Sequence, residues 1–278
     1  MKIDAHQHFW KFNHAEYEWI NEDMQVLKQD YLPNNLYPEL LKSGFTGSVA
    51  VQARQTVEET RWLLRWAEQH DFIKAVVGWV DLCSEKELRK QLDEFTKFPK
   101  FAGVRHVVHD EPDDSFMLRE DFLKGISNLS DYNLTYDLLL FPRHLQIAEK
   151  VVAQFPEQRF ALDHLSKPHI KQRIMHPWKE DLEKLALHNN VWCKISGMVT
   201  EADWNNYRPQ DLYPYLDAIF EIFGTDRLMF GSDWPVCLIV AEHATVTDIV
   251  EGYLRNFSAL DQHKIMGGNA AKFYNIRI

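Results

Sequence analysis

The 278-residue chain lacks several features that would place it outside the ordinary globular proteins. Its three cysteines, Cys83, Cys193 and Cys237, are widely spaced and form no CxxC pair. This pattern excludes a disulfide-stapled scaffold and a cysteine zinc knuckle. No run approaches the roughly 18 apolar residues that a membrane-spanning helix needs, and the acid at position 4 comes too early for a signal peptide. We therefore expect a reduced, cytoplasmic protein without a membrane partner.

Basic residues are also scarce, with 31 Lys plus Arg against 41 Asp plus Glu and a formal net charge of −10. Because phosphate contacts need clustered basic side chains, we expect no nucleic-acid partner. Hydrophobic residues make up 45% of the chain, enough for a large core in one domain spanning residues 1–278. The prevalence of twofold dimers among soluble oligomers favours a homodimer over other assemblies.

Short aliphatic runs alternate with longer, charged stretches along the whole chain. Several runs are almost continuously apolar, as expected of parallel strands covered by helices. This alternation predicts an α/β fold of the single-domain (β/α)8 TIM-barrel class. A doubly wound open sheet is the alternative, although no GxGxxG or P-loop motif follows any run. The predicted strands are residues 2–8, 48–53, 75–82, 101–108, 134–141, 159–165, 191–197 and 228–233.

The stretches between the strands contain helix-start signals and two long acidic loops. Thr56, with Glu59 three residues later, predicts a capping box, and Ser258 predicts an N-cap. Residues 9–33 and 109–120 are acidic loops of a length that often marks a functional lid.

Polar residues gather at the predicted strand ends, where the chemistry of such a barrel takes place. His6 and His8 end the first strand on the same face, because they are two residues apart. His164 ends the sixth strand and Asp233 the eighth. Three imidazoles and one carboxylate would suit a single divalent cation such as zinc. Asp233 would then take a proton from an activated water.

Four sequence phrases resemble a known family: HQHFW near the N-terminus, ALDHLSKP, LMFGSDWP, and GGNAAKFY near the C-terminus. They are similar to the amidohydrolase superfamily, and within it to the amidohydrolase-2-type TIM-barrel branch that includes sugar-lactone and pyrone-dicarboxylate lactonases. GVRHVVHDEPD and YDLLLFPRH resemble fuconolactonase- and rhamnonolactonase-like members. The resemblance covers about residues 2–276.

The resemblance implies that His6, His8 and His164 are metal-site histidines and that Asp233 is the general base. No lysine ends the fourth strand, where binuclear members carry a carboxylated lysine, so at most one metal is expected. Zinc is the first choice. Some lactonases of this branch work without a metal, so activity of this chain without one is left open.

Arg105 is the candidate to hold a substrate carbonyl, since a guanidinium offers several fixed donors. An ion pair with Asp137 inside the barrel is the alternative of equal weight. Asp4 faces the same side as His6 but is expected to lie deeper and to be structural. The candidates for substrate binding are Gln52, Lys194, Trp10 and Trp234. The histidines expected at the surface are His14, His70, His144, His176, His188, His243 and His263.

Together these observations predict a hydrolase that opens a sugar-acid 1,4- or 1,5-lactone, such as fuconolactone or rhamnonolactone. Asp233 would deprotonate the water that His164 and the other histidines orient, and Arg105 would stabilise the oxyanion. Two alternatives remain open: a metal-dependent decarboxylase of an aromatic or enoic acid, and a catalytically inactive barrel that only binds a ligand.

Overall fold

Eight parallel strands form one sheet in the computed structural model, which describes residues 1–277. Each strand pairs with the next along the chain. All the predicted strands are therefore confirmed, although the sixth and eighth end at Leu162 and Phe230, before His164 and Asp233. The strands are β1 (Ile3–Gln7), β2 (Gly47–Val51), β3 (Ile73–Gly78), β4 (Phe101–His106), β5 (Thr135–Leu138), β6 (Phe160–Leu162), β7 (Val191–Ile195) and β8 (Leu228–Phe230).

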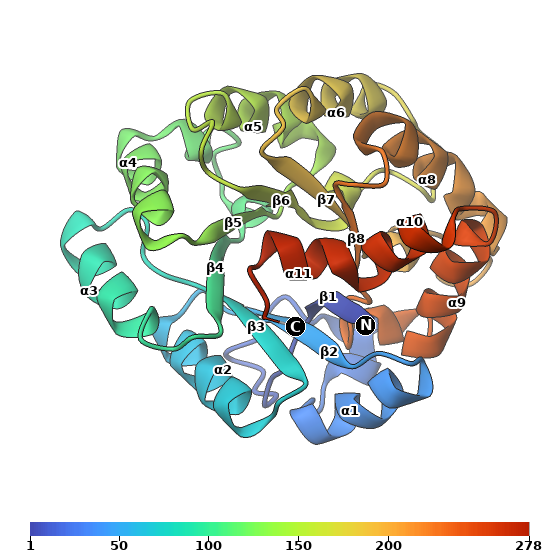
Figure 1. The fold of residues 1–278 in the computed structure, drawn as a ribbon, viewed down its shortest axis with the longest axis horizontal. Helices are drawn as coiled ribbons and strands as arrows, with labels where there is room; N and C mark the ends of the chain where they lie inside the picture. Colours follow the sequence, from blue (N-terminus) through green and yellow to red (C-terminus); the bar gives the residue numbers. More distant parts are fainter. Residues whose placement is uncertain (278) are drawn as a thin grey trace.

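Helices surround the strands as an outer ring (Figure 1). This arrangement confirms the TIM-barrel class. The longer helices are α1 (Pro33–Lys42), α2 (Val57–Gln69), α3 (Glu85–Phe95), α4 (Glu120–Leu129), α5 (Leu145–Val152), α6 (Trp178–Ala186), α8 (Pro209–Phe223) and α9 (His243–Leu254). The shorter ones are α7 (Met198–Glu201), α10 (Ala259–His263) and α11 (Asn269–Phe273).

The start of α2 differs from the predicted capping box. Thr56 does cap the helix, because its hydroxyl accepts a hydrogen bond from the Glu59 N–H at 3.2 Å. The Glu59 carboxylate, however, accepts from the N–H groups of Ala53 and Arg54, at 2.9 and 2.7 Å. Glu59 thus fixes the loop that follows β2. At α10 the predicted cap is confirmed, since the Ser258 hydroxyl accepts from the Asp261 N–H.

The barrel closes between β1 and the segment that follows β8. The Asp233 N–H donates to the His6 carbonyl at 2.8 Å, and the His8 N–H donates to the Trp234 carbonyl at 2.7 Å. These two bonds take the place of a regular strand ladder. As a result, barrel closure itself brings the first-strand histidines beside Asp233.

A buried carboxylate strengthens this closure. Asp4 is fully buried, and its Oδ1 accepts from the N–H groups of Ser232 and His6 at 2.8 and 3.1 Å. Its Oδ2 accepts from the Ser232 hydroxyl and lies 3.3 Å from His243 Nε2. Asp4 is therefore structural, as predicted, but His243 is not a surface residue.

His144 is the other histidine predicted to be at the surface that is fully buried. Its Nδ1 accepts from the Phe141 N–H at 3.1 Å, and its Nε2 lies 3.0 Å from Asp114 Oδ1. His243 and His144 are buried for the same reason. Each imidazole has a polar partner on both ring nitrogens, and buried polar groups are usually hydrogen-bonded in this way.

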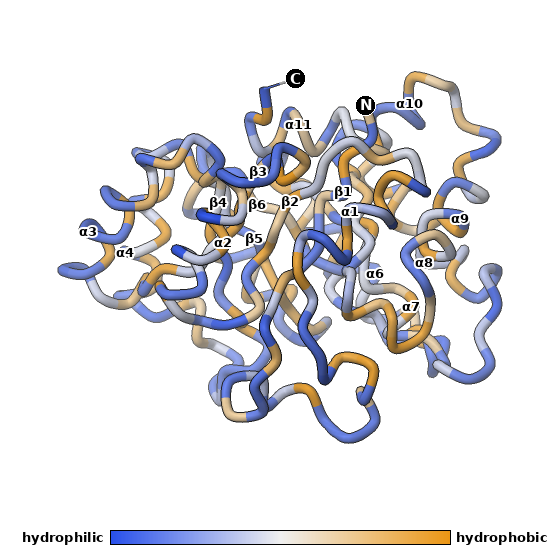
Figure 2. The backbone as a smooth tube through the Cα atoms, turned by 90° about the horizontal axis from the view of Figure 1, so that it is seen from below, coloured by the Kyte–Doolittle hydropathy of each residue, from blue (hydrophilic) through white to orange (hydrophobic). Residues whose placement is uncertain are grey.

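The interior of the barrel is apolar at one end. Alternate strand residues such as Val49, Val77 and Met229 pack there against Phe273 and Tyr274. Helix α11 lies across this end (Figure 1), on the same side as both termini, whereas long loops extend on the opposite side (Figure 2). A site can therefore form at the C-terminal ends of the strands.

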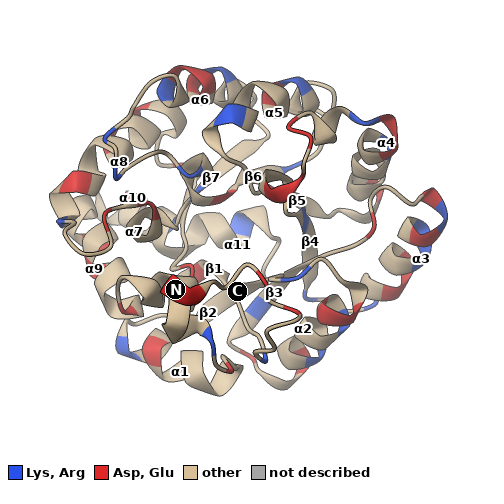
Figure 3. Ribbon diagram, turned by 180° about the vertical axis from the view of Figure 1, so that it is seen from behind, with Lys and Arg blue, Asp and Glu red and all other residues tan. Residues whose placement is uncertain are grey.

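Charged residues lie mainly on the outer helices, where Lys and Arg are interspersed with Asp and Glu (Figure 3). In pairs such as Arg61 with Glu94, both side chains are exposed. Each pair of this kind contributes about 0–1 kcal/mol to the stability of the fold. Stability therefore rests mainly on the apolar core. Within residues 1–277, none of the helices has both the length and the apolar character needed to cross a membrane.

Candidate active site

Three imidazoles converge on one carboxylate oxygen at the C-terminal face of the barrel. Asp233 Oδ1 lies 3.4 Å from His8 Nε2, 3.8 Å from His6 Nε2 and 3.9 Å from His164 Nε2. The Nε2 atoms of His6 and His8 are 3.1 Å apart. Each of these four residues is at most 4% exposed. The structure thus brings together the four residues predicted for the metal site.

In His8 and His164, a protein group holds Nδ1, so that Nε2 faces Asp233. His8 Nδ1 lies 2.8 Å from the Val51 carbonyl, which can only accept, so Nδ1 carries a proton and Nε2 is the nitrogen that faces Asp233. His164 Nδ1 lies 2.8 Å from the Ser196 hydroxyl. Burial holds the pKa values of His6 and His164 well below the usual range, so both rings are neutral.

This donor set fits one divalent cation. The ligand atoms of His6, His8 and Asp233 all lie within 4.8 Å of one another, and so do those of His6, Asp163 and His164. Neutral imidazoles with their other nitrogen held by a protein group are the usual arrangement for zinc ligands. The first group fits better, because Asp163 already forms ion pairs with two buried cations.

Unusual backbone conformations aim two of these side chains. Four consecutive non-glycine residues have positive φ: His164 (54°), Leu165 (54°), Ser166 (60°) and Lys167 (49°). Asp233 has φ 60°. A left-handed conformation costs roughly 1–2 kcal/mol for each such residue. Strain of this size is tolerated where surrounding packing fixes it, and it is often found at functional sites.

Gly197 gives the His164 ring its space. This residue has φ +63°, and a Cβ built there would lie 2.6 Å from His164 Nδ1. We expect Gly197→Ala to displace the ring and lower kcat/KM by about 100-fold, the effect typical of a misplacement of about 1 Å. Steady-state kinetics would measure it. Gly224→Ala is the matched control, because it has the same φ but no atom within 4 Å. Equal activity of the two variants would contradict this role of Gly197.

A network of buried charged groups, here called the ionic lattice, lies beneath the histidines. Its members are Arg105, Asp137, Asp163, Lys194 and Tyr274. Lys194 Nζ donates to Asp137 Oδ2 at 2.6 Å and lies 2.9 Å from Asp163 Oδ1. Arg105 Nη1 donates to Asp163 Oδ2 at 3.0 Å. The ion pair of Arg105 with Asp137, which was the alternative to substrate binding by Arg105, is therefore wrong. Although the two residues are in register on β4 and β5, Asp137 is occupied by Lys194.

This lattice also fixes His6. The ring nitrogen Nδ1 lies 3.1 Å from Lys194 Nζ and 3.3 Å from Asp163 Oδ1, and Nε2 lies 3.3 Å from Arg105 Nη1. Lys194 is fully buried and Arg105 is 4% exposed. Lys194 therefore acts on the site through His6 and the carboxylates, whereas Arg105 directs Nη1 toward the ring nitrogen of His6 that faces Asp233.

Sequence reasoning missed two members of the lattice. Asp163 lies directly before His164 within the apolar run ALDHL, and a charged residue in such a run signals a buried partner. Tyr274 donates its hydroxyl to Asp137 Oδ2 at 2.8 Å from the end of α11. No local pattern indicates that contact, since 137 positions separate the two residues.

The remaining predicted binding residues are buried. Gln52 is fully buried and holds Arg105 from both sides, with its Nε2 on the Arg105 carbonyl at 3.2 Å and its own carbonyl accepting from the guanidinium. Trp10 is fully buried against Tyr17, Trp19 and Tyr31. The structure thus places Trp10 in a small core of the 9–33 loop and not at the mouth. This is a correction.

Trp234 is 2% exposed and packs edge-on against Phe9 and Tyr31. Its ring therefore joins the 9–33 loop to the segment after β8. Its backbone closes the barrel beside Asp233, so this tryptophan is near the site through its main chain. Because the indole is buried, a sugar ring could not stack on its face.

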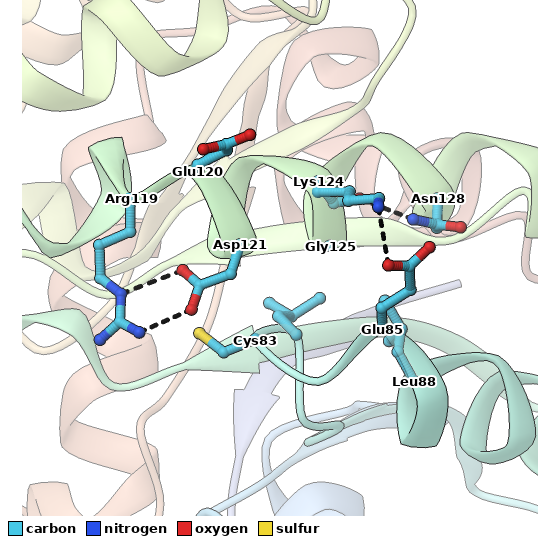
Figure 4. A pocket seen from close by; sticks show the side chains of 10 residues that line it. Cys83, Glu85, Leu88, Arg119, Glu120, Asp121, Lys124, Gly125 and Asn128 are labelled. Atoms are coloured by element: carbon cyan, nitrogen blue, oxygen red, sulfur yellow. Dashed lines mark hydrogen bonds and ion pairs between the residues drawn. The ribbon is translucent and has the colours of Figure 1, made fainter.

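A surface groove of about 580 Å³ lies between α3 and α4. Its two basic residues form ion pairs with acidic ones, Arg119 with Asp121 and Lys124 with Glu85 (Figure 4). None of the residues around Asp233 lines this groove. Both of its basic side chains are therefore paired, and the histidine cluster remains the candidate site.

Comparison with known proteins places this geometry in a family. The amidohydrolase family model Amidohydro_2 matches residues 3–276. L-fucono-1,5-lactonase of Burkholderia multivorans is 39% identical over 285 aligned residues, covering 99% of this chain and 96% of the relative. L-fucono-1,5-lactonase of Burkholderia ambifaria is 34% identical over 281 residues, again covering 99% and 96%.

A solved structure of an amidohydrolase from Burkholderia multivorans with bound zinc is similar to the whole chain. It is 39% identical, has a TM-score of 0.96 and covers 100% of both chains. The resemblance inferred from the four sequence phrases is thereby confirmed. The chain belongs to the amidohydrolase family and has its TIM-barrel fold.

Proposed function

We propose that this protein hydrolyses the lactone of a sugar acid, with L-fucono-1,5-lactone as the first substrate to test. The convergence of three imidazoles on Asp233 carries the proposal, because it places a base and its orienting groups within one site. Support for the substrate class comes from the two fuconolactonases, which are similar to this chain over 99% of its length.

Asp233 is the general base of this mechanism. Although burial acts to raise its pKa, His164, His8 and Lys167 together hold it below the usual value, so the carboxylate is ionised. It takes a proton from a water that His8 and His164 orient, and the water oxygen adds to the lactone carbonyl. When the ring C–O bond breaks, Asp233 returns the proton to the departing oxygen.

Arg105 supplies positive charge next to the histidines. Its Nη1 faces His6 Nε2, the side on which a carbonyl oxygen would become an oxyanion. Lys194 has no exposed atom and acts by positioning His6. When bound, a divalent cation held by His6, His8, His164 and Asp233 would supply further positive charge that favours deprotonation of the water.

Metal removal is expected to lower the rate of lactone hydrolysis by less than about 10-fold, because Asp233 and Arg105 remain in place. A general base alone increases the rate by about 100- to 10,000-fold. Activity of chelator-treated protein, with its metal content measured, would test this. Recovery upon added zinc is the control. Complete loss after chelation would show that the protein groups alone are insufficient.

Proton release on a panel of sugar-acid lactones is the test of the proposed function. We expect hydrolysis of fucono- and rhamnonolactones by the wild type. If the folded protein opened no lactone, with or without zinc, and instead released CO2 from an aromatic or enoic acid, the decarboxylase alternative would replace the proposal.

The proposal includes a cytoplasmic location and a homodimer. Cys83, Cys193 and Cys237 are all unpaired, which supports a reducing compartment. Cell fractionation and light scattering would test the two statements separately.

A further inference from the structure

The left-handed turn His164–Lys167 carries a charged residue, Lys167, that the mechanism above uses only for its influence on the pKa of Asp233. Its first residue, His164, faces Asp233, and its last residue, Lys167, precedes Pro168, which disfavours a right-handed helical conformation at Lys167. The turn is held by the Lys167 N–H bond to the His164 carbonyl at 2.7 Å and by Trp178 Nε1 donating to the Leu165 carbonyl at 2.7 Å. The packing thus fixes where Lys167 points.

Lys167 lies at the edge of the site with an accessible ammonium group. Its side chain is 20% exposed, and its Nζ donates to Glu201 Oε1 at 3.1 Å. The charge of Lys167 contributes to the low pKa of Asp233, and after burial it is the largest influence that lowers the pKa of His109 to about 3. Its ammonium lies beside α7, in the loop that follows β6 at the same end of the barrel as Asp233.

The other two cationic side chains of the site already form buried ion pairs. Arg105 and Lys194 are almost fully buried and pair with Asp163 and Asp137. Lys167 has one carboxylate partner, Glu201, whose side chain is 23% exposed. A ligand carboxylate can take the place of the Glu201 carboxylate, because one charge-assisted hydrogen bond to the ammonium then replaces another.

We infer that Lys167 binds the carboxylate of the open-chain sugar acid, and this inference rests on the proposed function. Water adds to the carbonyl carbon, the ring C–O bond breaks, and the new acid loses its proton near neutral pH. A neutral ester thus becomes an anion beside the negative charge of Asp233. Lys167 is placed to balance that anion, with Glu201 as its partner when the site is empty.

Two substitutions that break the same ion pair distinguish binding from a structural role. Lys167→Met is expected to weaken binding of the open acid at least 10-fold, because it removes a charge-assisted hydrogen bond. Glu201→Gln is expected to tighten it about 2- to 5-fold, because the ammonium is released. If the pair only fixed α7 to the turn, both variants would change binding in the same direction.

Isothermal titration calorimetry with L-fuconate is the experiment, on wild type, Lys167→Met, Lys167→Arg, Glu201→Gln and Lys171→Met. Lys167→Arg should stay within 3-fold of wild type, since it keeps the charge. Lys171→Met changes an exposed lysine of the same segment and should have no effect. Melting temperatures establish that each variant is folded. Kinetics should show weaker product inhibition by L-fuconate in Lys167→Met and unchanged product inhibition in Lys171→Met.

Equal binding of L-fuconate to wild type and Lys167→Met would overturn the inference, and so would weaker binding to Glu201→Gln. No L-fuconate binding to wild type would also overturn it. Failure of the proposed function is separate, because it appears as absence of lactone turnover by wild type. In that case, L-fuconate binding that is lost only in Lys167→Met would still support this role of Lys167.

Discussion

Asp233→Asn is expected to lower kcat/KM on the best lactone by about 100- to 10,000-fold, the contribution usual for a general acid–base group. The amide has nearly the same shape as the carboxylate but cannot accept the proton of the attacking water. The two main-chain bonds that close the barrel beside Asp233 use backbone atoms, so they persist in the variant. Initial-rate measurements of proton release would give the effect.

Asp71→Asn is the matched control for this substitution. Asp71 is exposed and precedes β3, at the opposite end of the barrel from Asp233, so its activity should equal that of wild type. Circular dichroism should be unchanged in both variants. If Asp233→Asn retained more than a tenth of wild-type activity, another group would have to be the base.

Asp163→Asn is expected to destabilise the protein by about 3–5 kcal/mol, the usual cost of removing one partner of a buried ion pair. The lattice holds two cations, Arg105 and Lys194, against two carboxylates, Asp137 and Asp163. Despite burial, Lys194, His6 and Arg105 hold the pKa of Asp163 well below its usual value, so it is charged. Its neutral replacement leaves one buried positive charge unbalanced.

The measurement is the free energy of unfolding in urea, or the melting temperature if unfolding is irreversible. Asp181→Asn serves as the control. Asp181 is also buried at 5% exposure, but its cationic partner, Lys184, has a side chain that is 62% exposed and can return to water. We expect a loss of less than about 1 kcal/mol there. Similar losses in the two variants would show that charge balance in the barrel is unimportant.

The sequence allowed the strands and the four converging residues to be predicted for identifiable reasons. Buried parallel strands are nearly continuous apolar runs, and all eight were found in this way. Strand alternation put His6 and His8 on one face, and the barrel class put His164 and Asp233 at the same end. These inferences need only local periodicity and the order of elements.

Contacts across the barrel could not be predicted in the same way. Arg105 and Asp137 are in register on β4 and β5, yet the guanidinium reaches past β5 to Asp163, which directly follows β6. Which acid pairs with which cation depends on side-chain directions that strand periodicity leaves undetermined. The left-handed turn after β6 also has no sequence signal, because none of its residues is glycine.

Aromatic residues show another limit of sequence reasoning. Trp10 follows a strand end, where a ring can stack on a sugar, but the 9–33 loop folds over it and uses it as a core residue. Its Nε1 donates to the carbonyls of Leu27 and Gln29, within that same loop. Whether a long loop supplies its own core depends on tertiary packing that composition does not reveal.

The contact between Tyr274 and Asp137 has a consequence for protein synthesis. Ribosomes make the chain from the N-terminus, so α11 and Tyr274 emerge only after all eight strands. Until then, the apolar barrel end lacks its cover and Asp137 lacks the phenol that donates to it. A nascent chain stalled before residue 269 would therefore expose an uncovered barrel interior, the kind of surface that chaperones and proteases recognise.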